Sequence, residues 1–281
     1  MAAIDQAPLW SARFGELLLA HAPLAGARRV LDLACGTGFP LLELAGRLGP
    51  ASFCAGLDPW APATMVPEAE RSGMARAALK RQAYGVAAGL VLGDGAHIPF
   101  ASAAFDLVVI NLGLNNFDDP AAVLAECARV LPRGGRLALT TNRAMGNTRY
   151  PDGCMREFYA VFRETLVHLD LAACLPALDL QEGHRGTRAS VAALVEGAGF
   201  RVTRVVADHF TLRYRDGSAL LRNWFIRLGF LPGWRGVLAE LNDPSRERAV
   251  FAEIERRLNE QAAAAGELAL SVPMLYLEAE K

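Results

Sequence analysis

Hydrophobic and polar positions follow two alternating patterns through the first half of the chain. Short runs of leucine and β-branched residues predict buried strands at 28–33, 52–57, 90–92, 105–110 and 136–141. Apolar residues recur at helical spacing between them, as in 41–48, which Gly49 follows. Asp119 and Pro120 predict the start of another helix, and Gly134-Gly135 predicts its end. Strands that alternate with helices favour an α/β fold with a Rossmann-like, doubly wound and mostly parallel sheet.

The second half is less regular, and we expect it to complete the same single domain, 1–281. Residues 1–26 form a helical lead-in and 27–142 the core, whose last helix and strands lie in 189–207 and 267–281. Within these, we expect a helix over 190–199, a strand over 200–206 and a strand-like run over 268–279, giving seven strands in all. Two helix-rich cap insertions remain, 143–188 and 208–266. Val250, Ile254 and Leu258 recur every four residues in the second insertion.

Pro273 interrupts the strand-like run near the end of the chain. Proline has no backbone N–H to donate to a sheet, so it is found mainly at edges and bulges. We therefore expect a bulge there, or a register that exposes Pro273.

Composition narrows the function classes. Of the 281 residues, 52% are hydrophobic and 21% charged, enough for a large core. Lys and Arg number 29 against 30 Asp and Glu, so no overall basic excess points to nucleic acid. Five cysteines without a C-x-x-C pair argue against a disulfide framework or zinc ribbon, predict no metal site and fit the cytoplasm. No apolar stretch approaches the roughly 20 residues of a membrane span. The oligomeric state stays open.

A glycine turn between the first strand and the helix after it has the features of a ligand-binding site. Gly36 and Gly38 allow positive φ and close approach of a ligand, and a helix N-terminus points free N–H groups toward the same crevice. Asp58 ends the second strand, 22 residues after Gly36, the spacing of a carboxylate that binds ribose hydroxyls. A second turn, containing Asp94, follows the third strand. These features predict a nucleoside ligand at the carboxyl ends of the strands.

Two such ligands fit, a dinucleotide and S-adenosylmethionine. A dinucleotide fingerprint has a third glycine or an alanine where this chain has Leu41. Asp32, four residues before Gly36, suits a cationic amino-acid ligand better than a pyrophosphate. An NAD-dependent oxidoreductase remains a weaker alternative.

The motifs D-L-A-C-G-T-G (32–38), G-L-D-P (56–59), G-D-G-A-H-I-P-F (93–100), F-D-L-V-V (105–109) and R-V-L-P-R-G-G-R-L (129–137) occur in order. In this the chain resembles the class I S-adenosylmethionine-dependent methyltransferases, in particular the ubiquinone-biosynthesis and natural-product branch that methylates small molecules. The resemblance spans residues 28–141, about half of the chain.

The resemblance implies cofactor-binding residues Asp32, Ala34, Gly36, Gly38, Asp58, Pro59, Asp94, Gly95, Ala96, Asn111 and Leu112. In that family's pattern, the turn at Asp32 wraps the methionine portion, Asp58 holds the ribose and Asp94 accepts from the adenine amino group. Asn111 and Leu112 line the methyl-donor pocket.

The acceptor is expected to be a small, partly apolar metabolite. Asn115, Asn116, Tyr150 and Tyr159 are candidates for its pocket, although Asn115 and Asn116 equally suit a simple loop. We expect the insertions to cover the carboxyl ends of the strands, with packing on the opposite edge as the rival arrangement. No residue identifies itself as a catalytic base. A methyltransferase-like protein that binds the cofactor and serves assembly without catalysis is a further alternative.

Overall fold

A computed structural model describes residues 10–59, 73–142, 153–183 and 186–281. The chain separates into two compact units, each with its own interior. Unit 1 contains Met1–Thr141, Arg188–Ala207 and Leu275–Lys281, and unit 2 contains Asn142–Thr187 and Asp208–Met274. The units are described separately below.

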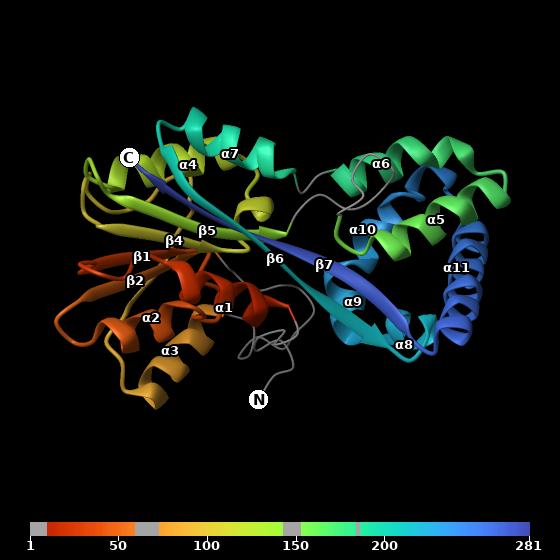
Figure 1. Ribbon diagram of the computed structural model, residues 1–281, viewed down its shortest axis with the longest axis horizontal. Helices are drawn as coiled ribbons and strands as arrows, with labels where there is room; N and C mark the ends of the chain where they lie inside the picture. The colour runs from red at the N-terminus through yellow and green to blue at the C-terminus, as the bar shows by residue number, and fades with distance from the viewer. Residues whose placement is uncertain (1–9, 60–72, 143–152, 184–185) are drawn as a thin grey trace. The chain divides into compact units, whose positions relative to one another are not determined.

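Unit 1 is built on a seven-stranded sheet of order β3-β2-β1-β4-β5-β7-β6 (Figure 1). Its strands are β1 (Arg29–Leu33), β2 (Phe53–Asp58), β3 (Gly89–Leu92), β4 (Leu107–Asn111), β5 (Arg136–Asn142), β6 (Arg201–Tyr214) and β7 (Leu268–Glu280). The first five strands pair in parallel. Gly134 and Gly135, just before β5, exchange backbone hydrogen bonds with Lys281, just after β7, so β7 runs antiparallel to β5. The expected mostly parallel, Rossmann-like sheet is confirmed.

Helices cover both faces of this sheet (Figure 1). Helices α1 (Ser11–His21), α2 (Leu41–Leu48) and α3 (Gly73–Tyr84) lie on one side, and α4 (Pro120–Val130) and α7 (Arg188–Gly197) on the other. The Asp119 side chain caps α4 by accepting from the Ala122 N–H at 2.9 Å, as expected. Core side chains of the second face include Leu31, Val108, Leu124, Val195 and Leu277. Because both faces are covered, the central strands are buried along nearly their whole length rather than at alternate positions.

Two boundaries and the burial of one residue differ from expectation. Helix α4 ends at Val130, not at Gly134-Gly135, because Pro132 disfavours a helical conformation at Leu131, which is extended. Strand β6 continues past residue 206 to Tyr214, so residues 208–214 are strand rather than insertion helix. Of the two arrangements expected at Pro273, the exposed register is wrong, because β7 runs through this residue and is buried from residue 272 to residue 279. The bulge stays a prediction.

Unit 2 is helical apart from the portions of β6 and β7 that it includes. Its helices are α5 (Arg156–His168), α6 (Leu175–Gly183), α8 (Gly217–Arg222), α9 (Trp224–Gly229), α10 (Leu231–Gly236) and α11 (Pro244–Ala265), with short 3-10 turns at Ala172–Cys174 and Ala239–Leu241. Phe158 stacks on Trp234 with ring centroids 3.8 Å apart. Val250, Ile254 and Leu258 are buried on α11, as their spacing predicts. Stacked aromatic rings and this apolar stripe therefore form the interior of unit 2.

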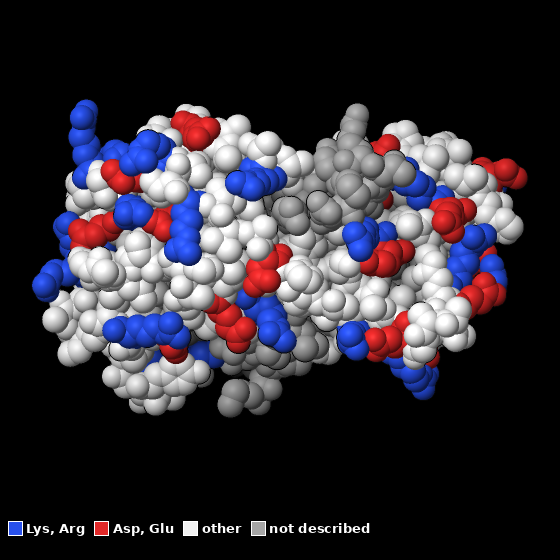
Figure 2. Space-filling model, viewed as in Figure 1, with Lys and Arg blue, Asp and Glu red and all other residues white. Residues whose placement is uncertain are grey.

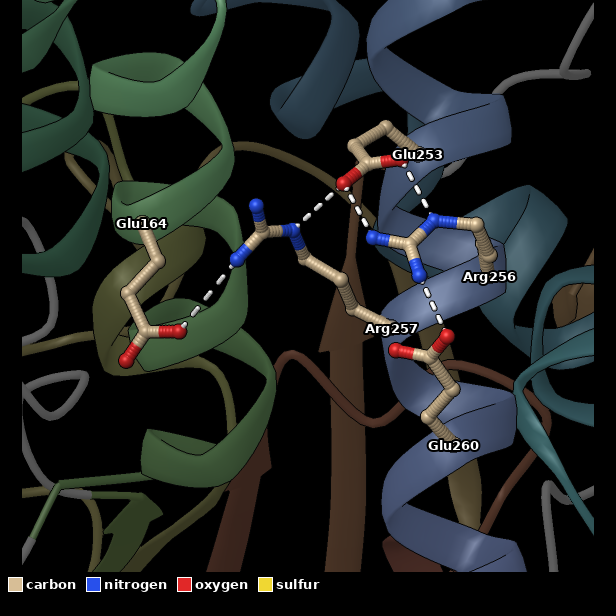
Figure 3. A network of polar contacts seen from close by, with 5 residues as sticks. All are labelled: Glu164, Glu253, Arg256, Arg257 and Glu260. Carbon is tan, nitrogen blue, oxygen red and sulfur yellow. Dashed lines mark hydrogen bonds and ion pairs between the residues drawn. The ribbon is translucent and has the colours of Figure 1, made fainter.

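Charged side chains of both signs are interspersed over the described surface in the view of Figure 2. One network joins α11 to α5 within unit 2 (Figure 3). Glu253 accepts from Arg256 Nε and from Arg257 Nε, each at 2.7 Å, and Arg257 lies 3.7 Å from Glu164 of α5. The two arginines lower the pKa of Glu253 to about 2, with Arg256 the larger cause.

Candidate functional site

The glycine turn after β1 adopts a conformation that side chains disfavour. Ala34, Gly36 and Gly38 have φ values of 62°, 52° and 94°. The backbone N–H groups of Ala34 and Cys35 donate to the Leu57 carbonyl at 2.8 and 3.3 Å, which ties the turn to β2. A Cβ on Gly36 would meet no described atom within 4 Å, so its backbone faces open space. A ligand can therefore approach the main chain there.

Asp58 connects the end of β2 to this turn. Its Oδ2 accepts the Gly36 N–H at 2.9 Å, and the residue is 7% exposed. Pro59, the next residue, is exposed. Asp58 thus stabilises the turn and places a carboxylate beside the open space at Gly36.

Asp32 is a fully buried carboxylate beneath the turn. Among the residues that the structure describes, neither of its oxygens has a hydrogen-bond partner. Burial raises the pKa of Asp32 well above its usual range, and the charge of Asp58 adds to this; the Leu41 N–H opposes the shift without completing a hydrogen bond. An unpartnered buried carboxylate is costly, and a cationic ligand group would offset that cost.

Asp94 closes the turn after β3. Its Oδ1 accepts the Ala96 N–H at 3.0 Å and its Oδ2 lies 3.3 Å from His97 Nδ1. The Ala96 hydrogen bond is the main reason that the pKa of Asp94 is lowered. Gly95 lies against an aromatic ring, since a Cβ there would be 3.3 Å from Phe117 Cε1. The turn is therefore closed by the Asp94 side chain, whose ionised carboxylate is exposed to solvent.

Asn111 joins three elements at the end of β4. Its Oδ1 accepts from Thr140 Oγ1 of β5 at 2.7 Å, and its Nδ2 donates to the Ser11 carbonyl of α1 at 3.4 Å. Leu112 follows in the left-handed region, with φ of 60°. The parallel register places Leu33 opposite Ile110, so the ends of β1 and β4 are neighbours.

The described acceptor candidates are distributed over both units. Asn115 Nδ2 donates to Thr141 Oγ1 at 2.6 Å, and Asn116 Nδ2 donates to the Leu112 carbonyl at 3.3 Å, both within unit 1. Tyr159 belongs to unit 2, where it is buried and its hydroxyl accepts from Trp234 Nε1 at 2.9 Å. Tyr150 lies outside the described residues. Their part in acceptor binding stays a prediction.

Residues to which the sequence analysis assigned no role also shape the site. A Cβ on Gly56 of β2 would lie 2.5 Å from Leu41 Cδ2 and 2.6 Å from Cys35 Sγ. Gly56 therefore supplies, from the strand, the space that a third glycine would give at position 41. A Cβ on Gly15 of α1 would lie 2.0 Å from the ring of Phe39, so α1 packs closely on the turn. The sequence signal that could have identified these two positions is a glycine inside a strand or helix pattern, where no turn requires one.

No group of three His, Cys, Asp or Glu side chains in residues 10–59, 73–142, 153–183 and 186–281 is placed to hold a metal ion. Over the same residues, no helix is long and apolar enough to cross a membrane.

Comparison of the sequence with known proteins points to one family. A family model described as a methyltransferase domain matches residues 31–139. The nocamycin O-methyltransferase of Saccharothrix syringae is 30% identical over 259 residues, which are 88% of this chain and 83% of that protein. The demethylmenaquinone methyltransferase of Thermotoga maritima is 35% identical over 150 residues, 53% of this chain and 57% of that protein.

The fold has solved counterparts as well. A putative methyltransferase from Bacillus halodurans superposes with a TM-score of 0.55 at 17% identity, covering 95% of this chain and 98% of that one. At that identity the likeness concerns the fold alone. The sequence likeness over most of both chains, however, confirms what the ordered motifs imply: the chain belongs to the class I S-adenosylmethionine-dependent methyltransferase family.

Proposed function

We propose that the chain transfers a methyl group from S-adenosylmethionine to a hydroxyl oxygen of a small, partly apolar metabolite. The choice of oxygen rests on the length of the match to the nocamycin O-methyltransferase. That match covers 88% of this chain, which is more residues than unit 1 contains, so it extends well into unit 2. The matches to demethylmenaquinone methyltransferases cover smaller shares of this chain, such as 53% and 64%.

The described residues fit the cofactor. When bound, S-adenosylmethionine supplies a methyl group on a positively charged sulfur. Asp32, whose oxygens lack partners, complements the cationic α-ammonium group. Asp58 offers its carboxylate to the ribose hydroxyls while holding Gly36, and Asp94 accepts from the adenine amino group. The remaining members of this proposed set are Ala34, Gly36, Gly38, Pro59, Gly95, Ala96, Asn111 and Leu112.

The protein's own contribution is alignment and exclusion of water, since the donor is already activated. We assign acceptor binding to the insertions, 143–188 and 208–266. Trp224 and Leu228, four residues apart on α9, are 40% and 45% exposed, and we take these two apolar side chains as candidates for contact with the acceptor. Tyr159 supports that unit from its interior. All five cysteines are buried and none forms a disulfide within the described residues, which supports a reducing, cytoplasmic setting.

The test is release of S-adenosylhomocysteine in the presence of hydroxylated metabolites and of a demethylated quinol. We expect turnover with a hydroxyl compound, and NMR of the product to locate the new methyl group on oxygen. Asp58→Ala should lose turnover, whereas Glu196→Gln, an exposed carboxylate on α7, should retain it. Methylation on carbon would refute the oxygen assignment. Cofactor binding without turnover on any acceptor would favour the assembly role.

Trp224→Ala tests the acceptor surface. It should raise KM for the acceptor and leave the Kd of S-adenosylhomocysteine unchanged. An unchanged KM would remove α9 from the acceptor site.

A further inference from the structure

One face of α3 lies against the glycine turn. Met74, Ala77 and Lys80 recur every three residues and therefore share a side of the helix. Met74 and Ala77 are buried and Lys80 is half-buried, whereas Ala75 and Leu79 are exposed. The buried side of this helix is thus the side that carries Lys80.

Two of these residues contact the turn through packing. Met74 Sδ lies 3.6 Å from Cys35 Sγ. A Cβ on Gly38 would lie 3.1 Å from Ala77 Cβ, which is already closer than most Cβ contacts. Helix α3 therefore supports the turn at both of these positions.

Lys80 contacts Thr37, which lies between Cys35 and Gly38 in the turn, by hydrogen bonds. Its Nζ donates to the carbonyl oxygen and to Oγ1 of Thr37, each at 3.3 Å. The Thr37 carbonyl and the Gly38 N–H belong to one peptide plane. That N–H donates to the Cys35 carbonyl at 2.8 Å, so the plane is held at both ends.

We propose that Lys80 is a positioning residue of the cofactor site, which holds the Thr37–Gly38 peptide plane and so preorganises the glycine turn. The reason for such a contact is the freedom of the turn. Gly36 and Gly38 both have positive φ and no side chain to restrict them. A turn that is fixed before binding loses less conformational entropy when the ligand arrives. This inference rests on the cofactor residues proposed above.

The experiment measures S-adenosylhomocysteine binding by calorimetry and Tm in the same samples. Lys80→Met keeps the length of the side chain and removes the ammonium, and we expect a Kd about five- to tenfold higher. Lys80→Arg should recover most of the affinity. Arg81→Met is the matched control, because Arg81 is a cation on the same helix that donates to the Ala88 carbonyl instead. Its Kd should equal that of wild type.

Thr37→Val gives an independent test that leaves Lys80 in place. It removes Oγ1 and retains the carbonyl, so we expect about a two- to threefold rise in Kd, and no further rise when it is combined with Lys80→Met. In turnover, Lys80→Met should raise KM for S-adenosylmethionine with kcat little changed.

Three outcomes would overturn the inference. One is a wild-type Kd in Lys80→Met, with or without a lower Tm, because Lys80 would then serve folding alone. Another is an equal loss of affinity in Arg81→Met, which would indicate a general charge effect. Failure of the wild-type protein itself to bind S-adenosylhomocysteine would refute the proposed cofactor residues and this inference together.

Discussion

The Gly36 N–H donates to Asp58 Oδ2 across 2.9 Å, which couples the turn after β1 to the end of β2. The carboxylate that we assign to the ribose is therefore also a structural partner of the turn. If the assignment is right, substitution at Asp58 should act on cofactor binding both directly and through the turn.

Asp58→Ala should weaken S-adenosylhomocysteine binding by about one to two decades. A hydrogen bond to a charged group contributes roughly 1.5–3 kcal/mol, and this substitution removes the carboxylate from both of its roles. Calorimetry gives the Kd and thermal unfolding gives the stability, with Glu196→Gln as the control. Wild-type affinity in Asp58→Ala would show that the residue only closes the turn.

Asp32 should make stability depend on pH in the absence of cofactor. Because burial raises its pKa, the folded protein retains a proton there at pH values where the unfolded chain has lost it. Stability then falls as pH rises from the unfolded pKa of about 3.9 toward the folded pKa. Asp32→Asn has no such proton. The Tm of Asp32→Asn should therefore rise relative to the Tm of wild type as pH increases from the unfolded pKa toward the folded pKa. A difference in Tm that stays constant with pH would contradict the assignment.

The same carboxyl should release a proton when the cofactor binds. A cationic ammonium group favours the ionised form of Asp32, so the proton held in the free protein must leave. Calorimetry in buffers of different ionisation enthalpy should detect proton release in wild type and none in Asp32→Asn. Equal proton release in both proteins would assign the proton to another group.

Gly56→Ala should destabilise the protein by about 1–3 kcal/mol, the usual cost of overpacking a core. The new methyl group would overlap Leu41 and Cys35, which are both buried and have little room to move. Denaturant unfolding measures the effect. Leu41→Ala should be less harmful in the Gly56→Ala background than alone, and strict additivity would contradict the proposed overlap.

Glu253 should stabilise unit 2 at pH values above the acidic range. Its two arginine partners lower its folded pKa from 4.5 to about 2, so their stabilisation is complete above the unfolded pKa and is lost as pH falls toward the folded value. Glu253→Gln should unfold more easily than wild type at neutral pH, and the two should converge near pH 2. Urea titrations at several pH values test this, and a difference that persists at the lowest pH would count against it.

The sequence alone predicted the local features of this protein. The first five strands, the cap at Asp119 and the stripe at Val250, Ile254 and Leu258 each depend on residues within a few positions of one another. The glycine turn belongs to the same class, because positive φ at Gly36 and Gly38 is a property of the residues themselves. Short-range conformational preference and hydrophobic spacing are sufficient for such elements.

Contacts between distant segments required the tertiary structure. Nothing near Lys80 in the chain indicates that it meets Thr37, 43 residues earlier, and nothing near Gly56 indicates that it makes room for Leu41. The continuation of β6 to Tyr214 and the burial of Pro273 are of the same kind. Sheet pairing and close packing satisfy backbone groups and exclude water through partners far along the chain, and they override local preference where the two conflict.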